Sequence, residues 1–394
     1  MHFTVITSEL LKALSTVKKV VPTNPLVPIL SNFLFVVKNG KLVITTSDLQ
    51  TSMVTVLPVQ DAKEGKIAVP TRHLVLTLGF LEENEPITFD FDTSNYSLAL
   101  TSSKGKYKLA CRSAEDFPEL SLDFDASLSI DIEASLIKKA LEQTMFAAGQ
   151  SESRPELNGV NMMLKNGTII FSATDGHQLA RYKHTRFQLQ TTSEKYENHQ
   201  EESFTIPHKP LQLLVQQLAL YKEKEYSMVN MAFDAHSVCF KKGPTHMRMR
   251  LADNEFRSYD NIIPTTTDLP KGVLTVDRDV LLKSLKMMAI YANKTHYIVK
   301  FKLGAKDTFE VSALDLSFAN EAKEVHECAY QGEAFEIGFN TQLLITMFSK
   351  MIAKKVIIRL NGPKSNAYIV PKDMEAEEDL LLLLAPMALS TVDF

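Results

Sequence analysis

The alternation of apolar and polar residues follows the same course three times along this 394-residue chain. Three segments align without gaps: FTVITSELLKAL (3–14), IDIEASLIKKAL (130–141) and LTVDRDVLLKSL (274–285). In each segment, apolar residues first recur at every second position, as in a half-buried strand, and then at every fourth, as on one face of a helix. The pattern therefore predicts a repeated unit that begins with a strand followed by an amphipathic helix.

A second strand-to-helix pattern lies further into each copy, at IAVPTRHLVLTL (67–78), FTIPHKPLQLLV (204–215) and FEIGFNTQLLIT (335–346). Short alternating strands surround it, and Asn39-Gly40 is typical of a two-residue hairpin turn. We therefore expect an α+β chain of three repeated domains, each with two helices on antiparallel sheets. The expected domains are 1–125, 126–268 and 269–394. The expected helices are 8–20, 71–81, 135–149, 208–221, 278–292 and 340–354.

The charges are distributed unevenly between these helices and the rest of the chain. The six helix windows carry a formal net charge of +9, whereas the whole chain carries −4, so the remainder carries −13. Lysine is a good helix former, which could by itself explain part of the excess. A surface that contacts the phosphates of a polyanion explains all six windows.

Simple geometry relates the number of helices to what they could enclose. Six helices about 10 Å across, side by side in a ring, leave an opening of roughly 9 Å, whereas twelve leave roughly 28 Å. A DNA duplex needs about 20 Å. Two chains, but not one, could therefore encircle DNA, with the sheets outside the helices pairing edge to edge across repeat boundaries and between subunits.

Composition excludes several other classes of protein. Apolar residues make up 45% of the chain, but no window has the 18 or so consecutive apolar residues of a membrane span, and the N-terminus lacks the pattern of a secretion signal. We therefore expect a cytoplasmic protein. Cys111, Cys239 and Cys328 are far apart and in no CxxC pair, which predicts reduced, buried thiols and no metal site.

The triplet Asp175-Gly176-His177 is the main candidate for enzyme chemistry. In the repeat alignment, however, Asp175 matches Asp48 and Asp315, so we expect a turn residue whose carboxylate binds nearby backbone amides. Recognisable nucleophile, metal or nucleotide motifs are absent from the sequence. A hydrolase that uses Asp175 and His177 is therefore the lesser alternative.

Several motifs carry a resemblance to a known family: VPILSNFLF (27–35), EDFPEL (115–120), LNGV (157–160), ATDGHQLA (173–180), Phe339-Asn340 and LLLAPMAL (382–389). Together with the triple repeat, they resemble the bacterial DNA polymerase III β subunit family, the replicative sliding clamps. The resemblance implies a head-to-tail homodimeric ring whose helices line a central hole around duplex DNA of any sequence. It also implies partners: an ATP-driven clamp loader, the replicative polymerase and other proteins with clamp-binding peptides. It implies no cofactor, metal or catalytic activity.

The resemblance also implies particular site residues. The groove for partner peptides would comprise Leu157, Thr174, Gly176, His177, Leu179, Ile262, Pro386, Met387 and Leu389. Gln150 matches a polar, DNA-facing position of the family. As cations of the helix set, the residues expected to face DNA beside it are Lys12, Arg72, Lys138, Lys209, Lys283 and Lys350. The dimer interface would bring Tyr107 and Leu109 of one subunit to Ile290 and Tyr291 of the other. Arg257, Asn261, Ala385 and Ala388 depart from the family's pattern beside the groove.

Two polar, charge-rich segments, 188–202 and 372–379, are predicted to be solvated loops. The principal alternative to a clamp is a non-catalytic, strand-rich repeat scaffold that binds proteins without encircling DNA. Such a scaffold would not stimulate a polymerase, and reversing the charge of its helix lysines would have no effect.

Overall fold

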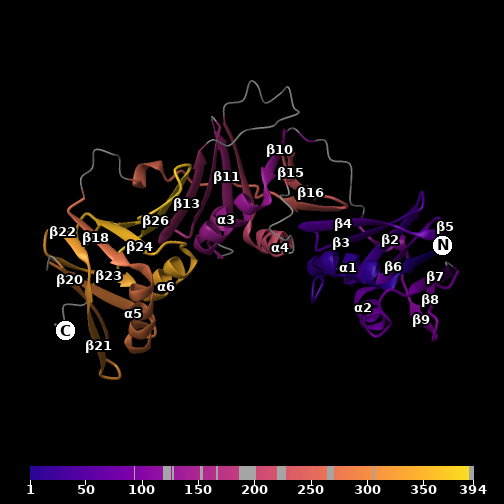
Figure 1. The fold of residues 1–394 in the computed structure, drawn as a ribbon, viewed down its shortest axis with the longest axis horizontal. Coiled ribbons are helices and arrows are strands. Elements are labelled where there is room, and N and C mark those ends of the chain that lie inside the picture. The colour runs from indigo at the N-terminus through magenta and orange to yellow at the C-terminus, as the bar shows by residue number, and fades with distance from the viewer. Residues whose placement is uncertain are drawn as a thin grey trace. The chain divides into compact units, whose positions relative to one another are not determined.

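A computed structural model describes residues 1–389 apart from 93, 119–125, 127, 151–153, 166, 186–200, 220–227, 264–269 and 305–306 (Figure 1). These residues form two compact units. The first comprises residues from 1–137 and 209–251, and the second comprises residues from 138–208 and 252–389. Most of the predicted loop 188–202 lies outside the described residues.

The first unit contains two antiparallel sheets. The five-stranded sheet has the order β5–β1–β7–β8–β9, with β1 (His2–Ile6), β5 (Gln60–Lys63), β7 (Pro86–Asp92), β8 (Ser97–Thr101) and β9 (Lys106–Ala110). The eight-stranded sheet has the order β10–β15–β16–β17–β4–β3–β2–β6. Its strands are β2 (Asn32–Lys38), β3 (Lys41–Ser47), β4 (Thr51–Pro58), β6 (Gly65–Pro70), β10 (Leu128–Glu133), β15 (Met228–Phe233), β16 (Ser237–Lys242) and β17 (Thr245–Arg250). The helices are α1 (Thr7–Val17), α2 (Thr71–Gly79) and α4 (His208–Leu218).

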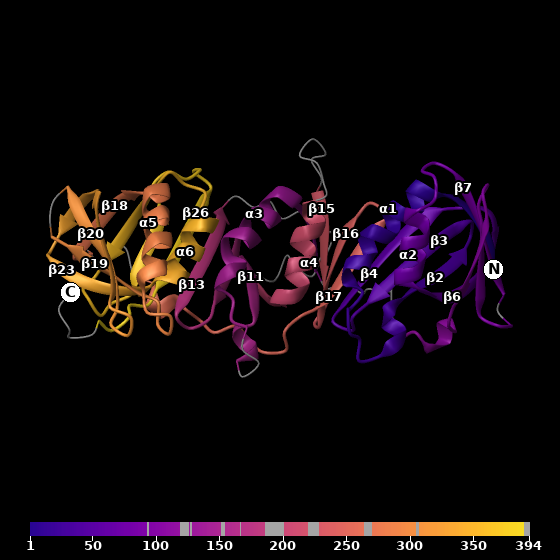
Figure 2. The ribbon, with the colours of Figure 1, turned by 90° about the horizontal axis from the view of Figure 1, so that it is seen from below.

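The second unit repeats this design. Its nine-stranded sheet has the order β14–β11–β12–β13–β26–β25–β24–β18–β22, and its four-stranded sheet has the order β21–β20–β19–β23. The strands of the larger sheet are β11 (Gly159–Lys165), β12 (Thr168–Thr174), β13 (Gln178–Thr185), β14 (Glu201–Pro207), β18 (Gly272–Asp277), β22 (Ala329–Gly332), β24 (Lys355–Leu360), β25 (Ala367–Pro371) and β26 (Glu378–Leu384). The smaller sheet contains β19 (Ile298–Leu303), β20 (Thr308–Asp315), β21 (Asn320–Glu327) and β23 (Phe335–Asn340). The helices are α3 (Ala134–Thr144), α5 (Arg278–Tyr291) and α6 (Thr341–Lys350), of which α5 and α6 lie side by side (Figures 1 and 2).

The predicted pairing of sheets across repeat boundaries is confirmed at both boundaries within the chain. Strand β17 of the second copy pairs antiparallel with β4 of the first, with Met247 opposite Met53. Strand β13 of the second copy pairs with β26 of the third, with Leu179 opposite Leu383. Each large sheet is therefore shared by two copies, so the strands of the second copy supply partners on both sides.

All six predicted helices are present, and their ends follow local chemistry. Asp277 begins α5 by accepting hydrogen bonds from the amides of Asp279 and Val280, and Asn340 begins α6 in the same way. The windows 135–149 and 340–354 were too long: α3 ends at Thr144, and α6 ends at Lys350, after which Met351 adopts an extended conformation. The Asn39-Gly40 turn is confirmed, since both residues have positive φ (51° and 68°) between β2 and β3.

Two other expectations need correction. Only Cys239 is buried, while Cys111 and Cys328 are half-buried thiols. The segment 372–379 is not a loop throughout, because β26 begins at Glu378. The Glu378 side chain is 8% exposed and paired with Lys139, whose side chain is 33% exposed, so a charged sequence here encodes an ion pair with a buried carboxylate. Among the described residues, none of the helices is both long and apolar enough to cross a membrane.

Candidate functional site

The hairpin between β12 and β13 contains Asp175, Gly176 and His177. Oδ1 of Asp175 accepts hydrogen bonds from the amides of His177 (2.8 Å) and Gln178 (2.9 Å), and Oδ2 accepts one from the side-chain amide of Gln178 (2.9 Å). Asp48 binds two amides of its own turn, and Asp315 binds one. The carboxylate thus closes a turn in all three copies, as the repeat alignment predicted. It is directed to backbone amides and not to the imidazole of His177, which removes the geometric basis for a hydrolase.

The segment after β26 runs beside this hairpin. The amide of Ala385 donates to the carbonyl of His177 (2.9 Å), and the amide of Met387 donates to the carbonyl of Gly338 within β23 (2.8 Å). A Cβ atom on Gly338 would lie 2.7 Å from the Met387 carbonyl oxygen, so only glycine permits this approach. The Pro386–Leu389 segment is therefore held between the hairpin and β23.

Leu157 reaches the same region through a short 3₁₀ helix, η5 (Pro155–Leu157). Arg154 precedes η5, and its Nη1 lies 3.2 Å from the position that a Cβ atom on Gly176 would occupy. Gly176 has a φ of +92°, which also favours glycine. The exposed guanidinium of Arg154 thus lies against the hairpin. The sequence analysis missed this residue, for which the neighbouring Pro155 was the only local signal.

Ile262 lies in a second 3₁₀ helix, η7 (Asp260–Ile262), and is 45% exposed. Its carbonyl accepts a hydrogen bond from the Tyr368 hydroxyl on β25 (2.9 Å). Just before η7, the Tyr259 hydroxyl pairs with Ser172 on β12 (2.6 Å). These bonds attach η7 to the strands that adjoin β13 and β26. Tyr259, like Arg154, was missed, because its role depends on a partner 87 residues away.

The nine predicted groove residues therefore belong to one part of the second unit, but they differ in exposure. Leu157 and Leu179 are buried, at 5% and 1% exposure. Thr174, Pro386, Met387 and Leu389 are half-buried, and Gly176, His177 and Ile262 are exposed. The arrangement has an apolar base and a rim of exposed side chains, which is the usual anatomy of a site for a short peptide. Assignment of individual groove residues stays a prediction.

The predicted DNA-facing residues are mostly exposed. Lys12, Arg72, Gln150, Lys209, Lys283 and Lys350 are exposed, whereas Lys138 is half-buried. Lys209 also forms an ion pair with the buried Asp48 (3.0 Å). Not every helix cation serves the same purpose, because Arg278 donates to the carbonyls of Ala353 and Phe348. Part of the positive charge of the helices is therefore used inside the fold.

Two of the four predicted interface residues lie on an edge strand, and the other two lie at the end of a helix. Tyr107 and Leu109 are on β9, the last strand of the five-stranded sheet, and Tyr107 is 37% exposed. Ile290 and Tyr291 form the last turn of α5, with exposures of 63% and 36%. Strand β21 ends the four-stranded sheet. Exposed apolar side chains beside unpaired strand edges are typical of surfaces that another chain covers.

Metal-ligating side chains do not gather in the described part of the chain, where no three of His, Cys, Asp and Glu are placed to hold an ion. The chemistry available at the hairpin and at the helix faces is therefore recognition by apolar contact, hydrogen bonding and charge.

Comparison with known proteins agrees with this description. The models of the N-terminal, central and C-terminal domains of the DNA polymerase III beta subunit match residues 1–121, 131–258 and 261–385. A Beta sliding clamp of Pseudomonas putida is 27% identical over 390 residues, which cover 99% of this chain and 100% of that protein. A Beta sliding clamp of Synechococcus elongatus is 26% identical over 366 residues, covering 92% and 94%. The crystal structure of the DNA polymerase III subunit beta from Pseudomonas aeruginosa superimposes with a TM-score of 0.89 at 26% identity, covering 99% of this chain and 100% of that chain. With matches to all three domains in order, the chain belongs to the DNA polymerase III beta subunit family, the DNA sliding clamps.

Proposed function

We propose that two copies of this chain close head to tail into a ring around duplex DNA and tether the replicative polymerase to it. The family is one of processivity factors and not of enzymes. The observation that carries the proposal is the triple repeat itself, which provides six helices on each chain, five of which carry an exposed cation. Twelve such helices could surround a duplex about 20 Å wide. The division into three domains, with two boundaries at 125/126 and 268/269, remains part of this proposal.

Complementary charges on two sheet edges support the head-to-tail dimer. Strand β9 has exposed Lys106 and Lys108, and β21 has exposed Glu321 and Glu327. In a ring, β9 of one subunit would extend the sheet that ends in β21 of the other, with Tyr107 and Ile290 among the apolar contacts. Because each chain offers both edges, the contact closes after two subunits.

The contact with DNA should be weak and independent of sequence. Lysine and arginine on helices attract phosphates without reading bases, so the ring can move along the duplex while its topology retains it. A ring cannot thread onto circular DNA unaided. We therefore also propose that an ATP-driven clamp loader opens it, in the cytoplasm.

Partner proteins would bind at the hairpin and the C-terminal segment. The Pseudomonas aeruginosa sliding clamp has been crystallised with griselimycin. For this chain we propose that short, partly apolar peptides of the polymerase and other proteins bind over Leu179, His177 and Met387. The flexible Met387 side chain suits a site that accepts several sequences. Arg257, Asn261, Ala385 and Ala388 would alter its specificity.

Retention on nicked circular DNA tests the proposed function. The protein is loaded by its clamp loader, and the circle is then cut once. We expect the protein to remain on the intact circle and to leave after linearisation, because only topology holds it. Retention on linear DNA would mean that direct contacts hold the protein, and the ring would be rejected. An inability to associate with circles under any loading condition would favour the scaffold without DNA encirclement.

A further inference from the structure

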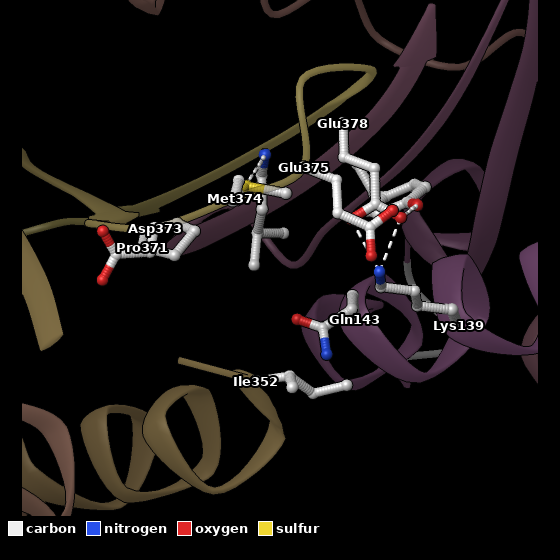
Figure 3. A pocket seen from close by; sticks show the side chains of 10 residues that line it. Lys139, Gln143, Ile352, Pro371, Asp373, Met374, Glu375 and Glu378 are labelled. Atoms are coloured by element: carbon white, nitrogen blue, oxygen red, sulfur yellow. Dashed lines mark hydrogen bonds and ion pairs between the residues drawn. The ribbon is translucent and has the colours of Figure 1, made fainter. Parts of the chain in front are cut away.

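A cavity in the second unit lies apart from the proposed peptide groove. It has a volume of about 320 Å³ and lies between α3, Ile352 just beyond the end of α6, and the segment that connects β25 to β26 (Figure 3). Cavities of this size with an apolar lining and a few convergent polar groups are typical of binding sites. The lining residues are Lys139, Gln143, Tyr182, Ile352, Pro371, Asp373, Met374, Glu375, Glu378 and Leu380.

One end of the cavity is a rigid polar cluster. Lys139 Nζ lies 2.6 Å from both carboxylate oxygens of Glu378, and the Tyr182 hydroxyl donates to Oε1 of Glu378 (2.6 Å). Burial raises the pKa of Glu378, but hydrogen bonds from Lys139 and Tyr182 outweigh burial and leave the pKa lowered. The Glu378 carboxylate therefore stays ionised near neutral pH and needs no ligand to satisfy it.

The remaining charge of the cavity is negative. Asp373 and Glu375 are exposed, so the lining has one lysine against three carboxylates, a formal net charge of −2. Figure 3 shows the Glu375 and Glu378 side chains extending toward the Lys139 end, with Asp373 and Pro371 at the opposite end. A positively charged group inside the cavity would thus meet carboxylates that the Lys139–Glu378 pair does not neutralise.

The walls between these carboxylates are apolar. Leu380 and Pro371 are buried, Met374 is half-buried, and Ile352 is 69% exposed on the opposite side of the cavity from the β25–β26 segment. Gln143 is held away from ligand binding, because its side-chain amide donates to the carbonyl of Lys350 (2.6 Å). The cavity therefore matches a group with an apolar stem and a cationic head.

We infer that this cavity binds a lysine or arginine side chain, with an adjacent apolar residue, presented by a partner protein of the clamp. The basic head lies at Glu375, which the Lys139–Glu378 pair does not neutralise, and the apolar neighbour packs on the exposed Ile352 and on Met374. This inference rests on the proposed function, because a clamp must dock other proteins.

The position of the cavity separates it from the proposed peptide groove, so a partner protein would contact the two sites independently. Along the β13–β26 pair, Gln178 and Leu384 lie at the groove end, and His184 and Glu378 lie at the cavity end. Six residues of strand separate the two ends, or about 20 Å. Leu179 and Tyr182 also point to opposite faces of the sheet, since their positions differ by an odd number. A partner that engages both sites would gain affinity from a raised effective concentration at the second site.

Methyl NMR of the full-length protein, labelled at methionine and isoleucine, tests this inference. The probes are blocked leucine–lysine and leucine–arginine dipeptides, with a blocked leucine–glutamate dipeptide as the matched control. We expect the cationic dipeptides to shift the Met374 and Ile352 methyl signals saturably, with little change at Met387 in the groove. The glutamate dipeptide should shift them at least fivefold less at equal concentration.

Two variants complete the test. Asp373→Asn/Glu375→Gln should weaken binding of the leucine–lysine dipeptide at least fivefold, whereas Asp116→Asn/Glu83→Gln, which removes two exposed carboxylates from the other unit, should leave it unchanged. Equal shifts with the glutamate dipeptide, or no shift at millimolar dipeptide, would overturn the inference. If n-butylamine bound with the same affinity as the leucine–lysine dipeptide, the cavity would be a site for small amines, and the inference of a protein partner would be rejected. Retention on circular DNA is measured separately, so failure here leaves the clamp function unaffected.

Discussion

At the scale of single residues, many carboxylates of this protein bind their own chain. Asp175 closes a hairpin, Asp277 caps α5, and Glu378 accepts hydrogen bonds from Lys139 and Tyr182. In each case a charged oxygen satisfies donors that the fold would otherwise leave without partners. These residues therefore affect stability more than recognition.

Replacing Asp175 should test its role in the turn. Asp175→Ala removes acceptors for two backbone amides and should lower the free energy of unfolding by about 1–2 kcal/mol. Asp175→Asn retains the Oδ1 acceptor and should cost less than half as much. Urea unfolding followed by circular dichroism measures both. An equal loss in the two variants would show that the charge, and not the hydrogen bonding, matters.

The Lys139–Glu378 pair should give stability a specific dependence on pH. Lys139→Met leaves a carboxylate that is 8% exposed with Tyr182 as its donor, and should destabilise the protein by about 2 kcal/mol at pH 7. The pKa of Glu378 is lower in the folded state, so its contribution is present above the unfolded pKa of about 4.3 and is lost as pH falls through the folded value.

Unfolding measured from pH 7 to pH 3 checks this sign. The difference in unfolding free energy between the wild type and Glu378→Gln should stay constant above about pH 5 and shrink below about pH 4. A difference that grows as the pH falls would contradict the lowered pKa.

At the scale of elements, strands of neighbouring copies pair with each other at both repeat boundaries. Other strands lie at sheet edges, where one side of the strand has no partner strand among the described residues. Strands β4 and β17, and β13 and β26, pair across copies, whereas β9 and β21 end their sheets in the described structure. A strand at a sheet edge can pair with strands of unrelated chains, and charged side chains on that strand reduce this risk. Lysines on β9 and glutamates on β21 also favour pairing of these two edges with each other.

Charge reversal should test the two edges as a pair. Lys106→Glu/Lys108→Glu and Glu321→Lys/Glu327→Lys should each weaken the dimer at least tenfold, because like charges then face each other. Mixing the two variants should restore dimers, since both contacts of the mixed ring again join opposite charges. Analytical ultracentrifugation measures the dissociation constants. Dimers that stay intact in each variant alone would place the interface elsewhere.

The helix cations should affect DNA contact in proportion to their number. Lys12→Glu/Lys283→Glu should shorten the residence of the loaded ring on circular DNA and reduce the salt dependence of that residence, because fewer phosphates are contacted. Lys38→Glu/Lys41→Glu changes two exposed lysines that flank the β2–β3 turn and serves as the matched control. Equal effects of the two changes would show that net charge, and not the helix faces, governs residence.

At the scale of the whole molecule, one folding unit has taken on different tasks in its three copies. The hairpin aspartate recurs in each copy, but Gly176 and His177 belong to the second copy only. The third copy supplies the Pro386–Leu389 segment beside them. The second copy contributes strands to sheets with both neighbours, so it is the natural location for a site that two copies share.

Groove variants should separate peptide binding from ring formation. His177→Ala/Met387→Ala should weaken binding of a polymerase-derived clamp-binding peptide at least tenfold. The two substitutions remove the exposed His177 side chain and the flexible Met387 side chain, which we expect to contact the peptide. The dimer constant and retention on circular DNA should not change. Fluorescence anisotropy with the labelled peptide checks the affinity. A simultaneous loss of dimerisation would show that the variant perturbs the fold.

The sequence by itself determined the local features. The triple repeat, the six helices, the Asn39-Gly40 turn and the hairpin aspartates follow from periodicity and from turn chemistry, which depend on neighbours within a few residues. Tertiary structure alone decided the contacts between residues that lie far apart in the sequence. Glu378 was predicted to be solvated because its neighbours in the sequence are charged. In the structure its carboxylate instead accepts hydrogen bonds from Lys139 and Tyr182, which lie 239 and 196 residues away in the sequence. The same holds for three further contacts: Arg154 against Gly176, Tyr259 with Ser172, and Arg278 with carbonyls of its own unit. Each depends on which elements the fold brings together, and the local sequence does not show that.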